Sequence, residues 1–185
     1  MPSVVFVESS VVIAYIKGRK DVFNPGAVML YEKLRDKKGR GIITETVRKE
    51  VTSKLNRLIA EALRKGNRKL ANSFVKKRGK FLECVEVHKV GGLQLSLKFG
   101  IVDSILGKVS LSKLQEVMLK KGRKTLHPEP KDKLIAAEVL ALKDEIEAEN
   151  FYVASTDQDF TYLLRDGLGE FSIIVDFPSS IARKL

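Results

Sequence analysis

Five carboxylates of this 185-residue chain occur at positions from which they could hold a metal ion together. Three follow short apolar runs typical of buried strands, and two lie in the first two turns of expected helices. Because the carboxyl ends of parallel strands meet at one edge of a sheet, we expect these side chains to gather there. Taken singly, each acid has a plainer interpretation as a helix cap or a surface charge. The set consists of Glu8, Asp157 and Asp159 after strands, and Asp132 and Glu50 on helices.

A group of carboxylates in an otherwise basic protein is the expected means of holding a hard divalent cation beside a phosphate backbone. Oxygen ligands alone suit Mg²⁺ or Mn²⁺, and one or two such ions would polarise a phosphodiester and activate water for in-line attack. The two histidines, His88 and His127, have no companion at metal-ligand spacing, and one cysteine cannot build a cysteine-based metal clip. The sequence also lacks a glycine-rich phosphate loop, which argues against nucleotide-driven chemistry.

The positive charge of the chain is concentrated in one segment. Overall, 34 Lys and Arg face 23 Asp and Glu, a formal net charge of +11 at pH 7. Residues 33–80 contain 17 Lys and Arg against four acids, so this segment holds the whole surplus. Such a concentration favours a polyanion-binding surface over a merely solvated helix face. A smaller basic stretch covers residues 120–133. The residues expected to bind nucleic acid are Arg48, Lys49, Arg64, Lys65, Arg68 and Lys69.

Apolar runs alternate along the chain with segments of helical periodicity. Strands are expected at 4–7, 41–43, 81–90, 151–155 and 171–175. Helices are expected after Glu8 with a serine cap, and at 24–36, 45–66, 67–79, 112–121, 132–149 and 157–165. The alternation predicts an α/β fold with an open parallel sheet flanked by helices in Rossmann-like layering, and an enlarged helical or irregular middle segment. We expect one domain over residues 1–185, in which residues 61–127 could form an insertion.

Four segments resemble the motifs of the PIN-domain nucleases, a family that includes the ribonuclease toxins of bacterial and archaeal toxin–antitoxin pairs. VVFVESSVVIAYI is similar to the opening strand with its acid and following serine, and ITETVRKEV resembles the second motif. DKLIAAEVL resembles the third motif, and FYVASTDQDF the fourth, in which a small hydroxyl precedes two aspartates and a phenylalanine. The resemblance covers residues 1–60 and 128–177 and leaves residues 61–127 unexplained.

The resemblance implies a PIN-like sheet and a metal-dependent endoribonuclease that prefers single strands and leaves a 5′-phosphate and a 3′-hydroxyl. It assigns the four acidic positions to Glu8, Glu50, Asp132 and Asp157, with Mg²⁺ or Mn²⁺ as the cofactor. Asp159 would be a further ligand, direct or through water, and Ser10 and Ser155 would orient the carboxylates or the attacking water. One departure is Glu8, because the family's first acid is typically aspartate, and the extra methylene moves the carboxylate by roughly an ångström.

Several roles stay open at this point. The first is a free-standing endoribonuclease of RNA processing, and the second is the toxin of a toxin–antitoxin pair. The third is a catalytically weak or inactive PIN module that binds RNA or protein, with Glu8 as a sign of decay. RNA is the expected partner, and an antitoxin, a ribosome-associated factor or a second copy are further options. A cytoplasmic location is expected, because no apolar run approaches a spanning helix and the chain has no tryptophan for a membrane surface.

Overall fold

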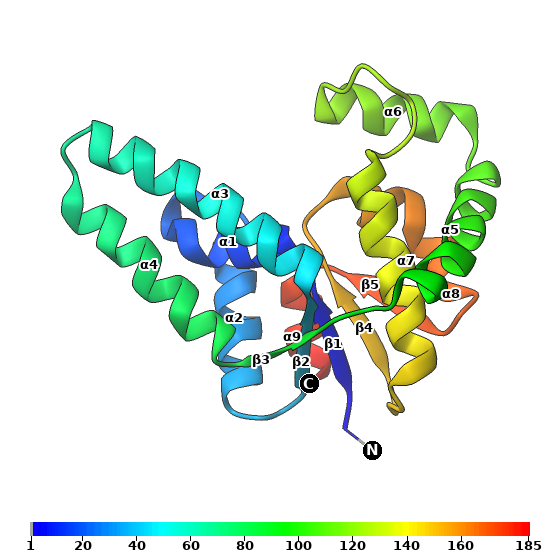
Figure 1. Cartoon of the computed structure of the whole chain (residues 1–185), viewed down its shortest axis with the longest axis horizontal. Helices are drawn as coiled ribbons and strands as arrows, with labels where there is room; N and C mark the ends of the chain where they lie inside the picture. The colour runs from blue at the N-terminus through cyan, green and yellow to red at the C-terminus, as the bar shows by residue number, and fades with distance from the viewer. Residues whose placement is uncertain (1) are drawn as a thin grey trace.

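Runs of branched and aromatic residues form a five-stranded parallel sheet. The computed structural model describes residues 2–185, and its strands are arranged in the order β3-β2-β1-β4-β5 (Figure 1). Every side chain of β1 and β4 is buried, as is typical of parallel strands covered on both faces. The strands are β1 Val4–Val7, β2 Arg40–Thr44, β3 Val85–His88, β4 Phe151–Ala154 and β5 Ile173–Asp176.

Helices connect and cover these strands. The α-helices are α1 Ser9–Lys17, α2 Asn24–Arg35, α3 Glu45–Arg64, α4 Arg68–Leu82, α5 Gly92–Gly107, α6 Leu111–Lys121, α7 Pro130–Glu145, α8 Arg165–Gly169 and α9 Pro178–Lys184. A 3₁₀ turn, η1, spans Gly18–Lys20, and a π-helix, η2, spans Asp159–Leu164. One group consists of α1, α2, α3, α4 and α9, which pack against one another, and a second consists of α5, α7, α8 and η2. Figure 1 shows the α3–α4 hairpin as one arm of the molecule and α6 as the opposite arm.

The order of the strands reverses between β1 and β4. The chain builds β1, β2 and β3 outward in one direction and then returns to build β4 and β5 in the other. Parallel pairing aligns Val7 with Ala154, the last residues of the two strands. In open α/β sheets, ligands bind in the crevice at the carboxyl ends of the strands where the order reverses. The residues that follow β1 and β4 therefore flank the position where a site is expected.

The structure confirms the α/β fold class and corrects several element boundaries. Residues 81 and 82 continue α4, so the expected strand at 81–90 is wrong in its first part. The helix expected at 157–165 is the π-helix η2 followed by α8, and α7 ends at Glu145 instead of 149. The cap of α1 is Glu8 and not a serine, because the longer side chain reaches back to accept a hydrogen bond from the Ser10 amide.

Two helices, α5 and α9, were not expected from the sequence. α5 carries only two charged residues, Lys98 and Asp103, and its apolar residues are distributed around the helix without a single face. Periodicity therefore gave no signal, although α5 packs against both α7 and α8. Within residues 2–185, no helix combines the length and the apolar composition that a membrane span requires.

Contact between α5 and α8 depends on the absence of a side chain at Gly167. A Cβ atom at this position would lie 2.3 Å from Cγ2 of Ile105 and 2.9 Å from its Cγ1. Both atoms are near the stiff branch point of an isoleucine, which cannot move aside as the end of a flexible chain would. Glycine therefore allows α8 to approach α5 closely.

We predict that Gly167→Ala lowers the melting temperature by several degrees, because overpacking a close contact costs about 1–3 kcal/mol. Thermal unfolding followed by circular dichroism measures the effect. Gly169→Ala in the same helix is the matched control, since no atom of the described residues 2–185 lies within 4 Å of a Cβ there. A Gly167→Ala protein that melts with the parent would mean that α8 is not held against α5 at this point.

Candidate functional site

Glu8 begins the candidate site at the end of β1. Its backbone amide donates to the Ala154 carbonyl at 3.0 Å, which continues the β1–β4 pairing by one residue. The buried carboxylate accepts hydrogen bonds from the Ser9 hydroxyl at 2.6 Å and the Ser10 amide at 2.9 Å. The Ser155 hydroxyl donates to the same carboxylate at 3.4 Å. The first acid is thus held by neutral donors at the start of α1.

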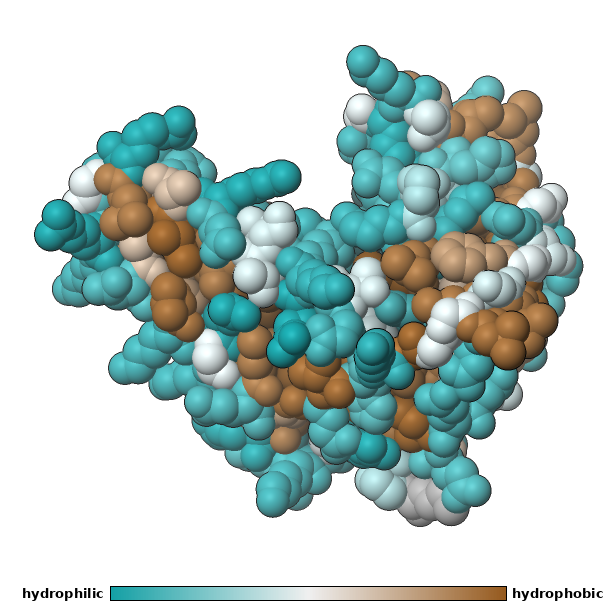
Figure 2. Space-filling model, in the orientation of Figure 1, coloured by the Kyte–Doolittle hydropathy of each residue, from teal (hydrophilic) through white to brown (hydrophobic). Residues whose placement is uncertain are grey.

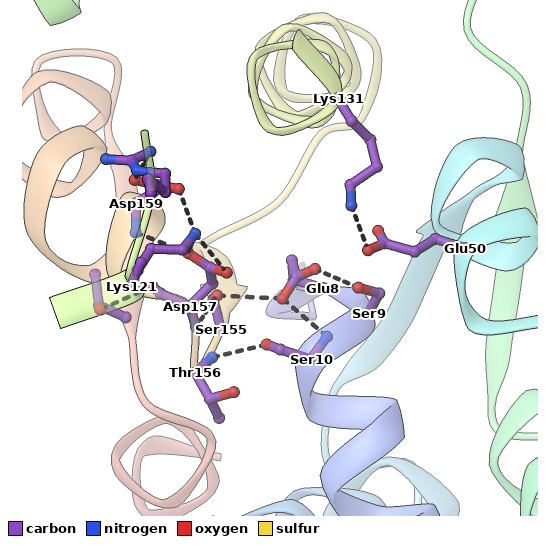
Figure 3. A network of polar contacts seen from close by, with 12 residues as sticks. Glu8, Ser9, Ser10, Glu50, Lys121, Lys131, Ser155, Thr156, Asp157 and Asp159 are labelled. Carbon is purple, nitrogen blue, oxygen red and sulfur yellow. Dashed lines mark hydrogen bonds and ion pairs between the residues drawn. The ribbon is translucent and has the colours of Figure 1, made fainter. Parts of the chain in front are cut away.

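The two serines assigned to a supporting role connect the ends of β1 and β4 (Figure 3). The Ser10 hydroxyl accepts a hydrogen bond from the Thr156 amide at 3.0 Å, and the Ser155 hydroxyl accepts one from the Asp157 amide at 3.0 Å. Ser155 therefore contacts both the first acid and the backbone of the acidic loop that follows β4. These contacts fix the loop against the start of α1.

Asp157 and Asp159 share a cation from the end of α6. The Lys121 ammonium donates to the two carboxylate oxygens of Asp157 at 2.8 and 3.0 Å, and it also contacts Asp159 (Figure 3). Asp159 is fully buried and forms a second ion pair, at 2.8 Å, with the Arg123 guanidinium. Burial opposes the charge of Lys121, but its hydrogen bonds to both aspartates raise its pKa overall. A buried carboxylate with two cationic partners is a structural ion-pair centre, and both oxygens of Asp159 are already bonded to cations of the protein.

Glu50 lies on α3 and is bound by two lysines. The ammonium groups of Lys54 and Lys131 each lie 2.7 Å from its Oε1, and Figure 3 shows Lys131 reaching it from α7. Burial works against ionisation of Glu50, but these two hydrogen-bonded cations lower its pKa. Its second oxygen, Oε2, is buried without a hydrogen-bond partner among residues 2–185. This oxygen is available to a cation that enters the site.

Asp132 lies in the first turn of α7 and is 9% exposed. Burial, followed by the negative charge of Asp157, raises the pKa of Asp132 to about 7. The charge of Asp159 acts in the same direction, and the cations Lys121 and Lys131 oppose it only in part. A carboxyl group in this state gains from a divalent cation nearby, because the cation favours its charged form.

The structure brings all five predicted acids to one edge of the sheet but does not join them around one point. Within residues 2–185, no three acidic, histidine or cysteine side chains are grouped so that they could hold one ion. Lysines form ion pairs with these acids instead. Lys121 pairs with Asp157 and Asp159, and Lys131 pairs with Glu50. The donors still suit Mg²⁺ or Mn²⁺ chemically, since they are all oxygens and the buried Oε2 of Glu50 has no partner in the described part of the chain.

A sixth acid, Glu138 on α7, was missed by the sequence analysis. It is 4% exposed, and its carboxylate accepts hydrogen bonds from the Thr44 hydroxyl at 2.6 Å and the Thr46 hydroxyl at 2.5 Å. Burial raises the pKa of Glu138, and these two hydrogen bonds partly oppose that. Thr44 is also the N-cap of α3, so Glu138 ties the helix of Asp132 to the helix of Glu50. The available signal was a lone glutamate inside the apolar stretch LIAAEVLAL.

The six basic residues predicted to bind nucleic acid fall into two places. Arg48 and Lys49 lie in the first half of α3, and Lys49 borders the cavity that contains Glu50. The other four are exposed at the tip of the α3–α4 hairpin, namely Arg64, Lys65, Arg68 and Lys69. At 1.5 Å per residue, the 20-residue α3 is about 30 Å long, so the hairpin tip lies far from the acids.

We predict that Asp132→Asn stabilises the metal-free protein increasingly as the pH rises. The folded-state pKa of about 7 exceeds the ordinary aspartate pKa of 3.8, so this group's contribution to stability is complete below about pH 4 and is lost as the pH rises through 7. Replacing the acid removes that loss, which is at most about 4 kcal/mol. Melting temperatures in chelator at about pH 5 and pH 8 measure the difference. The exposed Asp144→Asn, at the other end of α7, is the control. A gain independent of pH would contradict the prediction.

Sequence comparisons do not assign this chain to a family. No protein-family model matches it, and no curated protein is similar to it. The resemblance to PIN-domain nucleases therefore rests on the four quoted segments. The arrangement of the acids and of the charge around them is the ground on which a function can be proposed.

Proposed function

We propose that this protein is a metal-dependent endoribonuclease whose site lies where the strand order reverses. The observation that supports this most is the position of the acids. Five carboxylates from four separate segments lie at the edge formed by β1 and β4, inside a chain of net charge +11. Two of them are close enough for Asp157 to raise the pKa of Asp132. Such crowding of like charges in a basic protein favours a divalent cation and a phosphate ligand.

The roles of the side chains follow from their contacts. Asp132 and Asp157 would hold Mg²⁺ or Mn²⁺, with Glu8 and the free oxygen of Glu50 as neighbouring donors. A bound ion would polarise the phosphodiester. It would also lower the pKa of water, so that a hydroxide nucleophile becomes available to attack the phosphorus. Ser155 keeps Glu8 and the Asp157 loop in place through its two hydrogen bonds. Lys131, which bonds to Glu50, carries a positive charge to the position where the phosphate would lie.

A second candidate is an RNA-binding module without catalytic activity. Three observations favour it. Lysines form ion pairs with Asp157 and Glu50, and the Glu8 carboxylate caps α1. The described acids also do not surround a common point at which one ion could bind. The two candidates share the same binding surface. They differ in whether a divalent cation can replace the lysines at the acids.

The first test is cleavage of a short single-stranded RNA with Mn²⁺, and with chelator in its place. We predict that Asp132→Asn and Asp157→Asn each reduce the rate about 100-fold or more, which corresponds to roughly 2.7 kcal/mol of barrier. Asp144→Asn, a charge change on the exposed end of α7, should cleave like the parent. Labelled products should carry a 5′-phosphate. Cleavage that persists in chelator, or that survives both site variants, would count against a metal-dependent site.

Substitutions at Glu8 distinguish an active nuclease from an inactive RNA-binding module. If the site is active, Glu8→Asp shortens the side chain, withdraws the carboxylate and should lower the rate about tenfold, or roughly 1.4 kcal/mol. Glu8→Gln keeps the length but removes the charge, and should nearly abolish cleavage. The same RNA assay measures both variants. A gain of metal-dependent cleavage in Glu8→Asp would instead indicate that the parent site has decayed.

A further inference from the structure

Three neighbouring cavities form one path across the candidate site. A cavity of about 540 Å³ between α3 and α4 shares Lys49 and Ser53 with a cavity of about 480 Å³ that contains Glu50. That second cavity shares Lys131 and Leu134 with the largest one, of about 1180 Å³, beside the loop between α6 and α7. Because neighbouring cavities have lining residues in common, the three lie in a row from α4 to the α6–α7 loop.

The walls of this path are strongly basic. Ten Lys and Arg line the three cavities, against only two acids, Glu50 and Glu129. Within residues 2–185, four of the cations form no ion pair, namely Lys49, Arg57, Arg78 and Lys124. Figure 2 shows hydrophilic residues around the hollow between the α3–α4 arm and the α6 arm. An extended anion in this position would therefore meet cations along its whole length.

Each end of the path also holds a buried guanidinium donor without a partner. The Nε of Arg78, in the cavity between α3 and α4, and the Nε of Arg123, in the largest cavity, form no hydrogen bond within residues 2–185. The Arg123 side chain is 7% exposed, so its unpaired donor carries a desolvation cost. Guanidinium groups bind phosphate oxygens well, and a phosphate at either end would relieve that cost.

The largest cavity adds an aromatic surface. Phe99 from α5 lines it together with Leu126 and Leu134, in the same cavity as the cations of the α6–α7 loop. An aromatic ring beside a basic groove is the usual arrangement for stacking an unpaired base while its phosphates contact lysines and arginines. Paired bases in a duplex do not expose a face for such stacking.

We infer that a single strand of RNA lies along this path, crosses α3 beside Glu50, and inserts a base against Phe99 in the cavity of the α6–α7 loop. The inference deepens the proposed function, because it specifies how the substrate reaches the acids. It also assigns the main contribution to binding to residues within the path, and only a minor one to the hairpin tip. Lys124 and Arg123 belong to the part of the chain that the family resemblance does not cover.

Two matched variants test this inference. The path variant is Lys49→Glu, Arg57→Glu and Lys124→Glu, and the tip variant is Arg64→Glu, Arg68→Glu and Lys69→Glu. Both sets are exposed and change the net charge equally. Binding of a labelled single-stranded RNA is measured by fluorescence anisotropy in chelator over a range of salt concentrations. The path variant should bind at least tenfold more weakly and lower the salt slope by about 2, at roughly 0.7 per phosphate contact. The tip variant should stay within about threefold of the parent.

A third variant, Phe99→Leu, distinguishes specific binding of single-stranded RNA from general binding of polyanions. It should weaken single-stranded RNA about tenfold, through loss of stacking, and leave inorganic polyphosphate binding unchanged. Duplex RNA of the same length should bind the parent more weakly than the single strand. Neutral Gln substitutions at the three path positions give the same comparison if charge reversal lowers the melting temperature.

Two results would overturn the inference. One is a tip variant that loses as much RNA affinity as the path variant or more. The other is Phe99→Leu binding RNA like the parent, which would indicate a general polyanion surface. Because chelator prevents metal-dependent cleavage, these results do not depend on activity. A protein that binds RNA along the path and never cuts it would refute the proposed function, but the inference about where RNA binds would still hold.

Discussion

The parallel pairing of β1 with β4 determines where the acids of the candidate site lie. The register places Val7 beside Ala154, although almost the whole chain separates them. Both strands therefore leave the sheet at the same edge, and Glu8 and Ser155 become neighbours. A slip of β4 by one residue would turn its side chains to the opposite face. β2 ends at the same edge with Thr44, which caps α3 and thereby sets the direction of the helix that carries Glu50.

Carboxylates gathered in this way need compensating charge, and the chain supplies it from distant segments. Lys121 comes from α6 to Asp157 and Asp159, and Lys131 comes from α7 to Glu50. Glu8 instead receives neutral hydroxyl and amide donors. These internal pairs explain why the acids are close but do not converge. Any divalent cation that binds here competes with ammonium groups of the protein itself, so local positive charge weakens metal binding while it attracts phosphate.

The sequence was informative wherever a local rule applied. Short β-branched runs predicted β1 and β4, and the Thr44 cap with apolar residues at helical spacing predicted α3. The position of acids directly after strands predicted which carboxylates share an edge. By contrast, α5 has no polar face, so its apolar residues gave no periodic signal.

Other features of the site depend on tertiary structure and could not be read from neighbouring residues. The pairing of Lys121 with Asp157 spans 36 positions, and both residues resemble ordinary surface charges in the sequence. Glu138 was overlooked because a glutamate is rarely buried, and only its two threonine partners make the burial tolerable. The basic surplus predicted a polyanion surface, but the direction of the helices decides which cations lie near the acids.

Glu138 also has a mechanical consequence. Its hydrogen bonds to Thr44 and Thr46 join α7 to the start of α3 through a buried contact. Lys121 likewise bonds the end of α6 to Asp157 and Asp159. Movement of α3, α6 or α7 relative to one another would have to break these bonds. A change in the shape of the hollow that leaves them intact therefore keeps the acids at the same spacing.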